Sequence, residues 1–313
     1  MTKPAKDPEG KPRPATPFVW RALKVALVAL ATAAVGCGFL YALDVFRAEV
    51  RVSPGYVMTS DSLRLVTYPK WMTGAILSEL DVGRLDPEFP YRFSLLDAGV
   101  CERIARAYER CPWVERVERI AKHDPRVDPG RAPLEVFLKF RRPLAFVQGR
   151  DGFRLLDERG VRLPGVYAEP RLGAAKFLVV TGIPALPPAA ATQAWSDPAV
   201  QAALKVADVV DARREAWRLA TIDMSNYGGR RDPRDTEIAL WTANDTRIKW
   251  GKAPGPGAVI LQEKTPEEKV AYLDYVYQFL HGEVDGYLSY IDVQNEAIRR
   301  RATTDVAAIR VRS

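Results

Sequence analysis

An uninterrupted apolar segment is the feature that most constrains this chain. From Val25 to Leu43, nineteen consecutive residues carry no charged side chain. A helix rises ~1.5 Å per residue, so this segment would be roughly 28 Å long, close to the ~30 Å hydrocarbon core of a bilayer. We therefore predict a transmembrane helix over residues 19–48. Its apolar surface would include Val25, Leu30, Val35, Leu40 and Leu43.

Two other interpretations of this segment are weaker. A cleaved signal peptide has a shorter apolar core and a small-residue exit site, and Asp44–Arg47 offers no such site. A buried helix of a soluble protein would normally show a polar face, and this run shows none over five turns. Small residues such as Gly36 and Gly38 leave two alternatives open, contact with a partner helix or simple tolerance in lipid.

Charged residues around the segment predict its direction. Six basic and two acidic side chains precede Val25, and a basic flank marks the cytoplasmic side of a membrane helix. We expect residues 1–18, which include five prolines, to form a disordered cytoplasmic tail, with the rest of the chain outside. The whole chain has a net charge of +7, of which the part after residue 24 carries only +3. That modest charge does not favour a nucleic-acid partner.

Cysteine usage gives little evidence of a disulfide framework. Cys37 lies inside the apolar segment, and Cys101 and Cys111 are ten residues apart on one predicted helix. That spacing separates them by about 15 Å, too far for a disulfide within an intact helix. A bond between two chains stays open.

Hydrophobic periodicity predicts an α+β organisation with two units after the anchor. Residues 60–142 show the order β-α-α-β-β. Its predicted elements are a strand at Leu63–Val66, a helix at Gly74–Leu80, a helix with the stripe Val100, Ile104, Ala107, Tyr108 and Cys111, and strands at Val114–Ile120 and Leu134–Phe140.

Residues 143–301 predict a mostly antiparallel β domain with two helices. The helices begin at Asp197-Pro198 and Thr265-Pro266, where a capping residue precedes a proline. The last clear strand is Gly286–Val293, with Ala297–Arg301 as one candidate more. We expect residues 302–313 to be a flexible tail.

Several motifs in this order resemble the FtsQ/DivIB family of bacterial cell-division proteins. Pro112-Trp113-Val114 is similar to the family's "PWV" after the second helix of its POTRA domain. Arg141-Arg142-Pro143 resembles the "R.P" that closes that domain, Asp157–Gly160 resembles the "D..G" of the following β domain, and Tyr290-Ile291-Asp292 resembles its late "YID" strand. The resemblance covers roughly residues 19–300.

The resemblance implies a fold, a place and partners. It implies a POTRA-like domain followed by an FtsQ-type β domain, held at the bacterial inner membrane and concentrated at the division septum. It also implies FtsB-like and FtsL-like bitopic division proteins as partners, with other divisome members. The chain departs from the family in a long link, His123–Pro133, in Gln294 where arginine is usual, and in a Pro/Ala-rich insertion at 182–196.

No catalytic motif stands out along the chain. The two histidines, His123 and His281, lie outside any metal-binding or redox motif, and His123 beside Asp124 fits a solvated pair better than a catalytic dyad. The Gly-rich stretches at 228–229 and 255–257 fit turns between strands better than phosphate loops. We therefore expect no enzymatic activity, no cofactor and no small-molecule substrate.

Recognition is the function that these observations favour. A terminal strand of an antiparallel sheet exposes unpaired backbone groups that a partner strand can join. The predicted contact residues are Tyr287, Tyr290, Ile291, Asp292, Val293 and Gln294. The plain alternative is that these side chains fill the core. The leading hypothesis is a divisome scaffold, with a POTRA-bearing envelope assembly factor or an extracytoplasmic wall-binding protein as alternatives.

Overall fold

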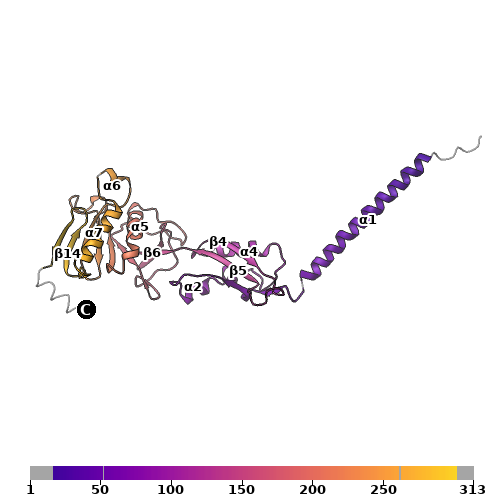
Figure 1. Cartoon of the computed structure of the whole chain (residues 1–313), viewed down its shortest axis with the longest axis horizontal. Helices are drawn as coiled ribbons and strands as arrows, with labels where there is room; N and C mark the ends of the chain where they lie inside the picture. Colours follow the sequence, from indigo (N-terminus) through magenta and orange to yellow (C-terminus); the bar gives the residue numbers. More distant parts are fainter. Residues whose placement is uncertain (1–16, 52, 261, 302–313) are drawn as a thin grey trace, which may run out of the picture.

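A computed structural model describes residues 17–51, 53–260 and 262–301. Most of the predicted cytoplasmic tail and the predicted tail 302–313 lie outside these residues. Figure 1 shows a long helix, α1, leading to a smaller α+β unit and then to a larger one that contains β14, α5 and α7. The larger unit lies at the end of the molecule remote from α1.

Helix α1 (Pro17–Arg51) contains 35 residues and is the predicted membrane helix, extended at both ends. Its segment Trp20–Arg51 contains an 18-residue window with a mean hydropathy of 2.1 and is long and apolar enough to cross a membrane. Four of the predicted lipid-facing residues, Val25, Leu30, Val35 and Leu40, are 66–73% exposed, and Leu43 is partly exposed. An apolar helix that packs against nothing in the described structure suits lipid better than water.

The smaller unit is a three-stranded sheet with helices on it. The sheet has the order β2-β5-β4, in which β2 is parallel and β4 antiparallel to β5. A separate ribbon of β1 and β3, absent from the prediction, precedes α4. The elements are β1 (Val57–Thr59), β2 (Leu63–Leu65), α2 (Gly74–Glu79), α3 (Val82–Leu85), β3 (Arg92–Ser94), α4 (Val100–Glu109), β4 (Val114–Lys122) and β5 (Leu134–Phe140).

The larger unit is built on one sheet of eight strands in the order β15-β14-β13-β12-β11-β10-β6-β7. A small hairpin, β8 (Arg171–Leu172) with β9 (Ala175–Lys176), stands apart from it. The sheet strands are β6 (Pro143–Gln148), β7 (Phe153–Asp157), β10 (Leu178–Thr181), β11 (Leu219–Asp223), β12 (Ile238–Thr242), β13 (Arg247–Gly251), β14 (Leu288–Asp292) and β15 (Ala297–Arg300).

This sheet is mixed, with four antiparallel and three parallel strand pairs, so the prediction of a mostly antiparallel domain is confirmed only in part. Strand β10 is parallel to both β6 and β11, and β13 is parallel to β14. The parallel direction of β10–β11 and of β13–β14 follows from the helices that connect these strands. Helix α5 (Pro198–Val210) connects β10 to β11, and α6 (Pro256–Ile260) and α7 (Pro266–Phe279) connect β13 to β14. A helix between two neighbouring strands returns the chain to the same end of the sheet, which makes the strands parallel.

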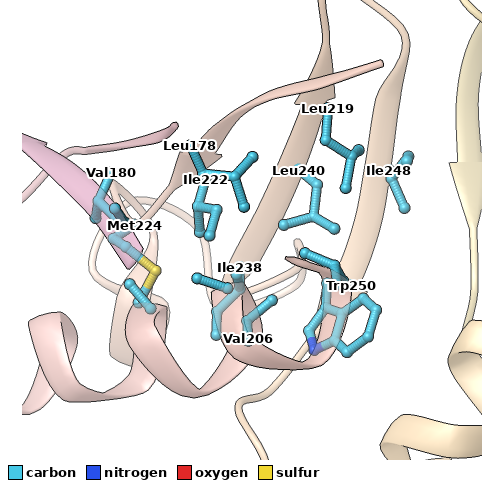
Figure 2. Packing of buried hydrophobic residues seen from close by; sticks show 14 of the residues in the cluster. Leu178, Val180, Val206, Leu219, Ile222, Met224, Ile238, Leu240, Ile248 and Trp250 are labelled. Carbon is cyan, nitrogen blue, oxygen red and sulfur yellow. The ribbon is translucent and has the colours of Figure 1, made fainter. Parts of the chain in front are cut away.

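The main core lies between the sheet and its helices. Figure 2 shows Leu178, Val180, Ile222, Leu240 and their neighbours from adjacent strands turned toward Val206 of α5. The five side chains named here are each at most 1% exposed. Full burial of an aliphatic side chain contributes roughly 1.5–3 kcal/mol, so this layer holds the larger unit together.

A second buried cluster joins the two units. It contains Ile104 and Leu138 of the smaller unit together with Phe146, Leu155 and Leu163 of the larger one. Phe146 packs edge-on against Tyr167 and Phe177, at ring-centre distances of 5.2 and 5.9 Å. The apolar core of the smaller unit therefore continues past residue 142 into the first strands of the large sheet.

Candidate partner-binding edge

The predicted edge strand is in fact an internal strand of the sheet. Strand β14 pairs with β13 through Arg247↔Tyr290 and with β15 through Ile291↔Ile298. The prediction that Gly286–Val293 forms the sheet edge was therefore wrong. A turn after Asp292, whose Oδ1 accepts hydrogen bonds from the amides of Gln294 and Asn295, brings β15 back alongside. In the described part of the chain, β15 is the outermost strand.

The opposite edge of the sheet is covered by the chain itself. Strand β7 makes isolated bridges from Phe153 to Tyr167 and from Leu156 to Arg162. The amide of Phe153 donates to the carbonyl of Tyr167 over 2.8 Å, and the amide of Tyr167 donates back over 2.9 Å. Edge strands left uncovered invite pairing with another chain, so β15 is the edge of this sheet that can receive one.

Strand β15 is short and strongly basic. Arg299 and Arg300 are exposed, and neither forms an ion pair with any residue between 17 and 301 that the structure describes. Arg301, just beyond the strand, donates to the carbonyl oxygens of Leu288 and Asp245. Basic side chains on an edge strand oppose pairing with another basic strand. A strand with acidic side chains would match their charge.

Two of the six predicted contact residues are core residues. Ile291 and Val293 are 0% exposed and pack with Leu273 and Val276 of α7 in the main core. They are unavailable to a partner while the sheet is intact. Asp292 and Gln294 instead order the β14–β15 connection, because Gln294 Oε1 accepts from the amide of Lys264 over 3.1 Å.

The two predicted tyrosines lie on β14 or just before it and are half-buried. The Lys249 ammonium is 5.1 Å from the ring centre of Tyr290, and the Arg300 guanidinium is 5.4 Å from that of Tyr287. Such cation–π contacts contribute ~0.5–1 kcal/mol at exposed positions. Tyr287 therefore contacts Arg300 of the edge strand β15, and Tyr290 contacts Lys249 of the neighbouring strand β13.

Helix α7 presents aromatic residues on the flank that faces β15. Its opposite flank contacts the α5 side, because the rings of Tyr277 and Trp217 stack with centres 5.8 Å apart. Tyr272, Tyr275 and Phe279 follow at i, i+3 and i+7, which places them together on one flank. Lys264 lies over the Tyr272 ring at 5.6 Å and bonds Glu296 in the β14–β15 turn, so this flank is the β15 side.

An exposed apolar strip results between α7 and the edge strand. Tyr275 and Phe279 are 60% and 61% exposed, and their rings stack with centres 6.0 Å apart. Ile298 of β15 is 41% exposed and is in register with Ile291, whose side chain points to the helix layer. We call Tyr275, Phe279, Ile298 and the backbone of β15 the open edge. The sequence offered a signal, since Tyr275 and Phe279 lie outside the buried stripe of their helix.

The motif residues of the first unit are structural. Trp113 is 1% exposed, and its Nε1 donates to Glu79 Oε2 over 2.9 Å. Val114 is buried and begins β4 directly after Pro112 and Trp113. The Trp113 carbonyl accepts from the amide of Arg141 over 2.9 Å, which ties the motif to the junction between the units.

Arg142 and Pro143 form that junction. Arg142 contacts three carboxylates, Glu158 at 3.0 Å, Asp208 at 2.5 Å and Asp211 at 3.0 Å. Pro143 is buried as the first residue of β6. Because Asp208 and Asp211 belong to α5 and its end, Arg142 fastens the connection between the units to the helix layer of the large sheet.

Between residues 17 and 301, as far as the structure describes them, no three His, Cys, Asp or Glu side chains gather in a way that could hold a metal ion. His123 pairs with Glu135, at 3.1 Å, rather than with Asp124. Hydrogen bonding from Arg131 lowers the pKa of Glu135, with burial acting in the opposite direction. This cluster is a set of ion pairs at the base of a loop.

Comparison with known proteins leaves the family of this chain open. No protein-family model matches it, and no curated protein matches it.

Proposed function

We propose that this protein is a non-enzymatic scaffold of the bacterial division machinery. In this proposal α1 anchors it in the inner membrane with a cytoplasmic N-terminus, and both units lie outside the cytoplasm at the septum. The motif resemblance to FtsQ/DivIB supports the proposal. So does the order β2, α2, α4, β4, β5 in the first unit, which fits the β-α-α-β-β order of a POTRA-like domain when α3 and the separate ribbon of β1 and β3 are set aside. Single-pass division proteins of the FtsB-like and FtsL-like kind would be the partners.

The open edge is the observation that carries this proposal. It combines unpaired backbone groups on β15, an exposed apolar strip and two arginines without ion partners in the described chain. A partner strand that pairs with β15 gains main-chain hydrogen bonds, and its side chains are then selected by their neighbours. The fitting partner is an extended segment that carries carboxylates toward Arg299 and Arg300 and apolar groups toward Ile298.

Co-purification of the full-length protein with FtsB-like and FtsL-like proteins of the same organism tests the proposal. In detergent, the paired substitution Arg299→Glu and Arg300→Glu should weaken capture by about tenfold or more, because like charges now oppose an acidic strand. Lys205→Glu, on the exposed surface of α5, is the matched control and should leave capture unchanged. Equal capture by wild type and the Arg299/Arg300 variant would refute binding at the open edge.

Localisation distinguishes the alternatives. A fluorescent protein fused before residue 1 should concentrate at midcell if the protein is a divisome scaffold. Uniform envelope fluorescence with co-purification of outer-membrane proteins would instead favour an envelope assembly factor. Sedimentation of the purified protein with isolated peptidoglycan, without division partners, would favour a wall-binding protein.

A further inference from the structure

The long loop between β4 and β5 turns back onto the segment that follows the anchor helix. Arg126, in this loop, donates from Nη2 to Ser53 Oγ over 3.2 Å. Its guanidinium carbon is 4.4 Å from the ring centre of Tyr56. The Tyr56 hydroxyl in turn donates to Asp124 Oδ2 over 3.2 Å. Three contacts therefore join two segments about seventy residues apart in the sequence.

The fit between these segments is close. A Cβ atom at Gly55 would lie 2.8 Å from Arg126 Nη2 and 2.9 Å from its Nε, shorter than side chains normally allow. The Arg126 amide donates to Asp124 Oδ1 over 2.9 Å, so one carboxylate holds both the loop and Tyr56. Glycine at 55 is what lets the guanidinium lie flat against the backbone.

Both ends of this contact continue into regular structure. On one side, the amide of Ser53 donates to the carbonyl of Val50 in the last turn of α1, over 3.1 Å. On the other, the amide of His123 at the loop base donates to the carbonyl of Pro133 over 2.9 Å. Glu135 of β5 pairs with His123, at 3.1 Å, and with Arg131, at 3.0 Å. The contact thus connects α1 to the sheet of the first unit.

We propose that the loop His123–Pro133 is a strap that fixes the direction of the first unit relative to α1. Without it, the two parts would be joined through the short segment after Arg51 alone, and that segment would allow a wide range of angles. Arg126 is the residue that closes the strap, because it donates to Ser53, lies over the Tyr56 ring and fits beside Gly55. The strap acts whatever partner the far unit binds.

Distance measurement between two spin labels tests the strap in the full-length protein in nanodiscs. The labels go on Glu49→Cys, exposed near the end of α1, and Glu102→Cys, exposed on α4. Cys37→Ala and Cys101→Ser remove the other accessible thiols, and the buried Cys111 stays. The doubly labelled protein with no further substitution, called the parent, should give one narrow distance distribution in pulsed electron paramagnetic resonance. Arg126→Ala should lose that single peak and give a broad distribution.

Two further variants keep the result decisive. Gly55→Ala leaves Arg126 in place but displaces its guanidinium, so it should broaden the distribution as well. Arg116→Ala, which removes an exposed arginine of the same unit on β4, should keep the narrow peak. A narrow peak in both Arg126→Ala and Gly55→Ala would overturn the proposal, and so would a broad distribution in the parent.

Discussion

The buried ion pair between Lys269 and Glu263 gives the sharpest stability prediction. Lys269 is 2% exposed, its Nζ lies 2.8 Å from Glu263 Oε2, and it sits 5.2 Å from the ring centre of Trp250. Glu263 also accepts the amide of Lys252 with both oxygens, at 3.1 and 2.9 Å. The pair therefore fastens the segment that carries α6 to the start of α7.

Removing Glu263 and removing Lys269 should lower the free energy of unfolding by different amounts. Glu263→Gln leaves a buried ammonium whose other acceptor is the Lys252 carbonyl at 3.4 Å, and an uncompensated buried charge costs about 3–5 kcal/mol. Lys269→Met keeps the shape of the side chain, and Glu263 keeps its backbone donor, so we expect about 1–2 kcal/mol. The double variant should recover most of the loss, because neither charge then remains.

Urea unfolding of the full-length protein in micelles, followed by tryptophan fluorescence, measures these differences. Trp250 lies beneath the pair and reports on its surroundings directly. The decisive quantity is the coupling energy from the double-mutant cycle, which we expect to exceed about 1 kcal/mol. Losses that simply add, with Glu263→Gln no worse than Lys269→Met, would show that the pair is not a coupled buried unit.

The same pair predicts a dependence on pH. Burial lowers the pKa of Lys269 below its ordinary value of 10.5, in spite of its bond to Glu263. The unfolded chain then holds more protons than the folded one at alkaline pH, so the free energy of unfolding rises with pH up to about 10.5. Lys269→Met should remove that rise. A wild-type curve parallel to that of Lys269→Met would contradict the assignment.

Three more predictions concern a helix cap, a buried hydroxyl and two exposed aromatic rings. Thr265→Ala removes the capping box of α7 and should cost about 1 kcal/mol in urea unfolding; an unchanged midpoint would mean that the cap is dispensable. Tyr277→Phe removes the 2.7 Å bond to the Trp217 carbonyl and should cost about 1–2 kcal/mol. Because burial raises the pKa of Tyr277, its contribution should be full below pH ~10 and decline above it, and a difference between wild type and variant that stays constant up to pH 11 would contradict this. Tyr275→Ala with Phe279→Ala should reduce partner capture without lowering the thermal midpoint, since both rings are exposed, and undiminished capture would exclude them from the interface.

Local signals in the sequence predicted individual elements well. Asp197 caps α5 by accepting from the amides of Ala199 and Val200, at 2.9 and 3.2 Å, as its position before proline indicated. The apolar segment forms one helix, and the alternating segments of the first unit form strands. These outcomes depend on neighbours within a few residues, which a sequence displays directly.

Strand neighbours could not be predicted in the same way. Strand β13 pairs with β12 in the antiparallel and with β14 in the parallel direction, and the second pairing depends on where α7 returns the chain. The prediction took Gly286–Val293 as the last clear strand and Ala297–Arg301 only as a candidate for one more. Backbone pairing with β14 makes Ala297–Arg300 a strand, and the side chains of this segment do not indicate that pairing. The open edge was missed for that reason.

The length of α1 sets a condition on any membrane partner. A helix of 35 residues is about 52 Å long, so with Val25–Leu43 in a ~30 Å bilayer core the last turns, Asp44–Arg51, stand clear of the lipid. The open edge then lies at the far end of two further units (Figure 1). Under the proposed function, a partner with its own membrane helix would reach the open edge only through a stalk of matching span. Shortening that stalk by whole helical turns would separate two proteins whose binding surfaces are untouched.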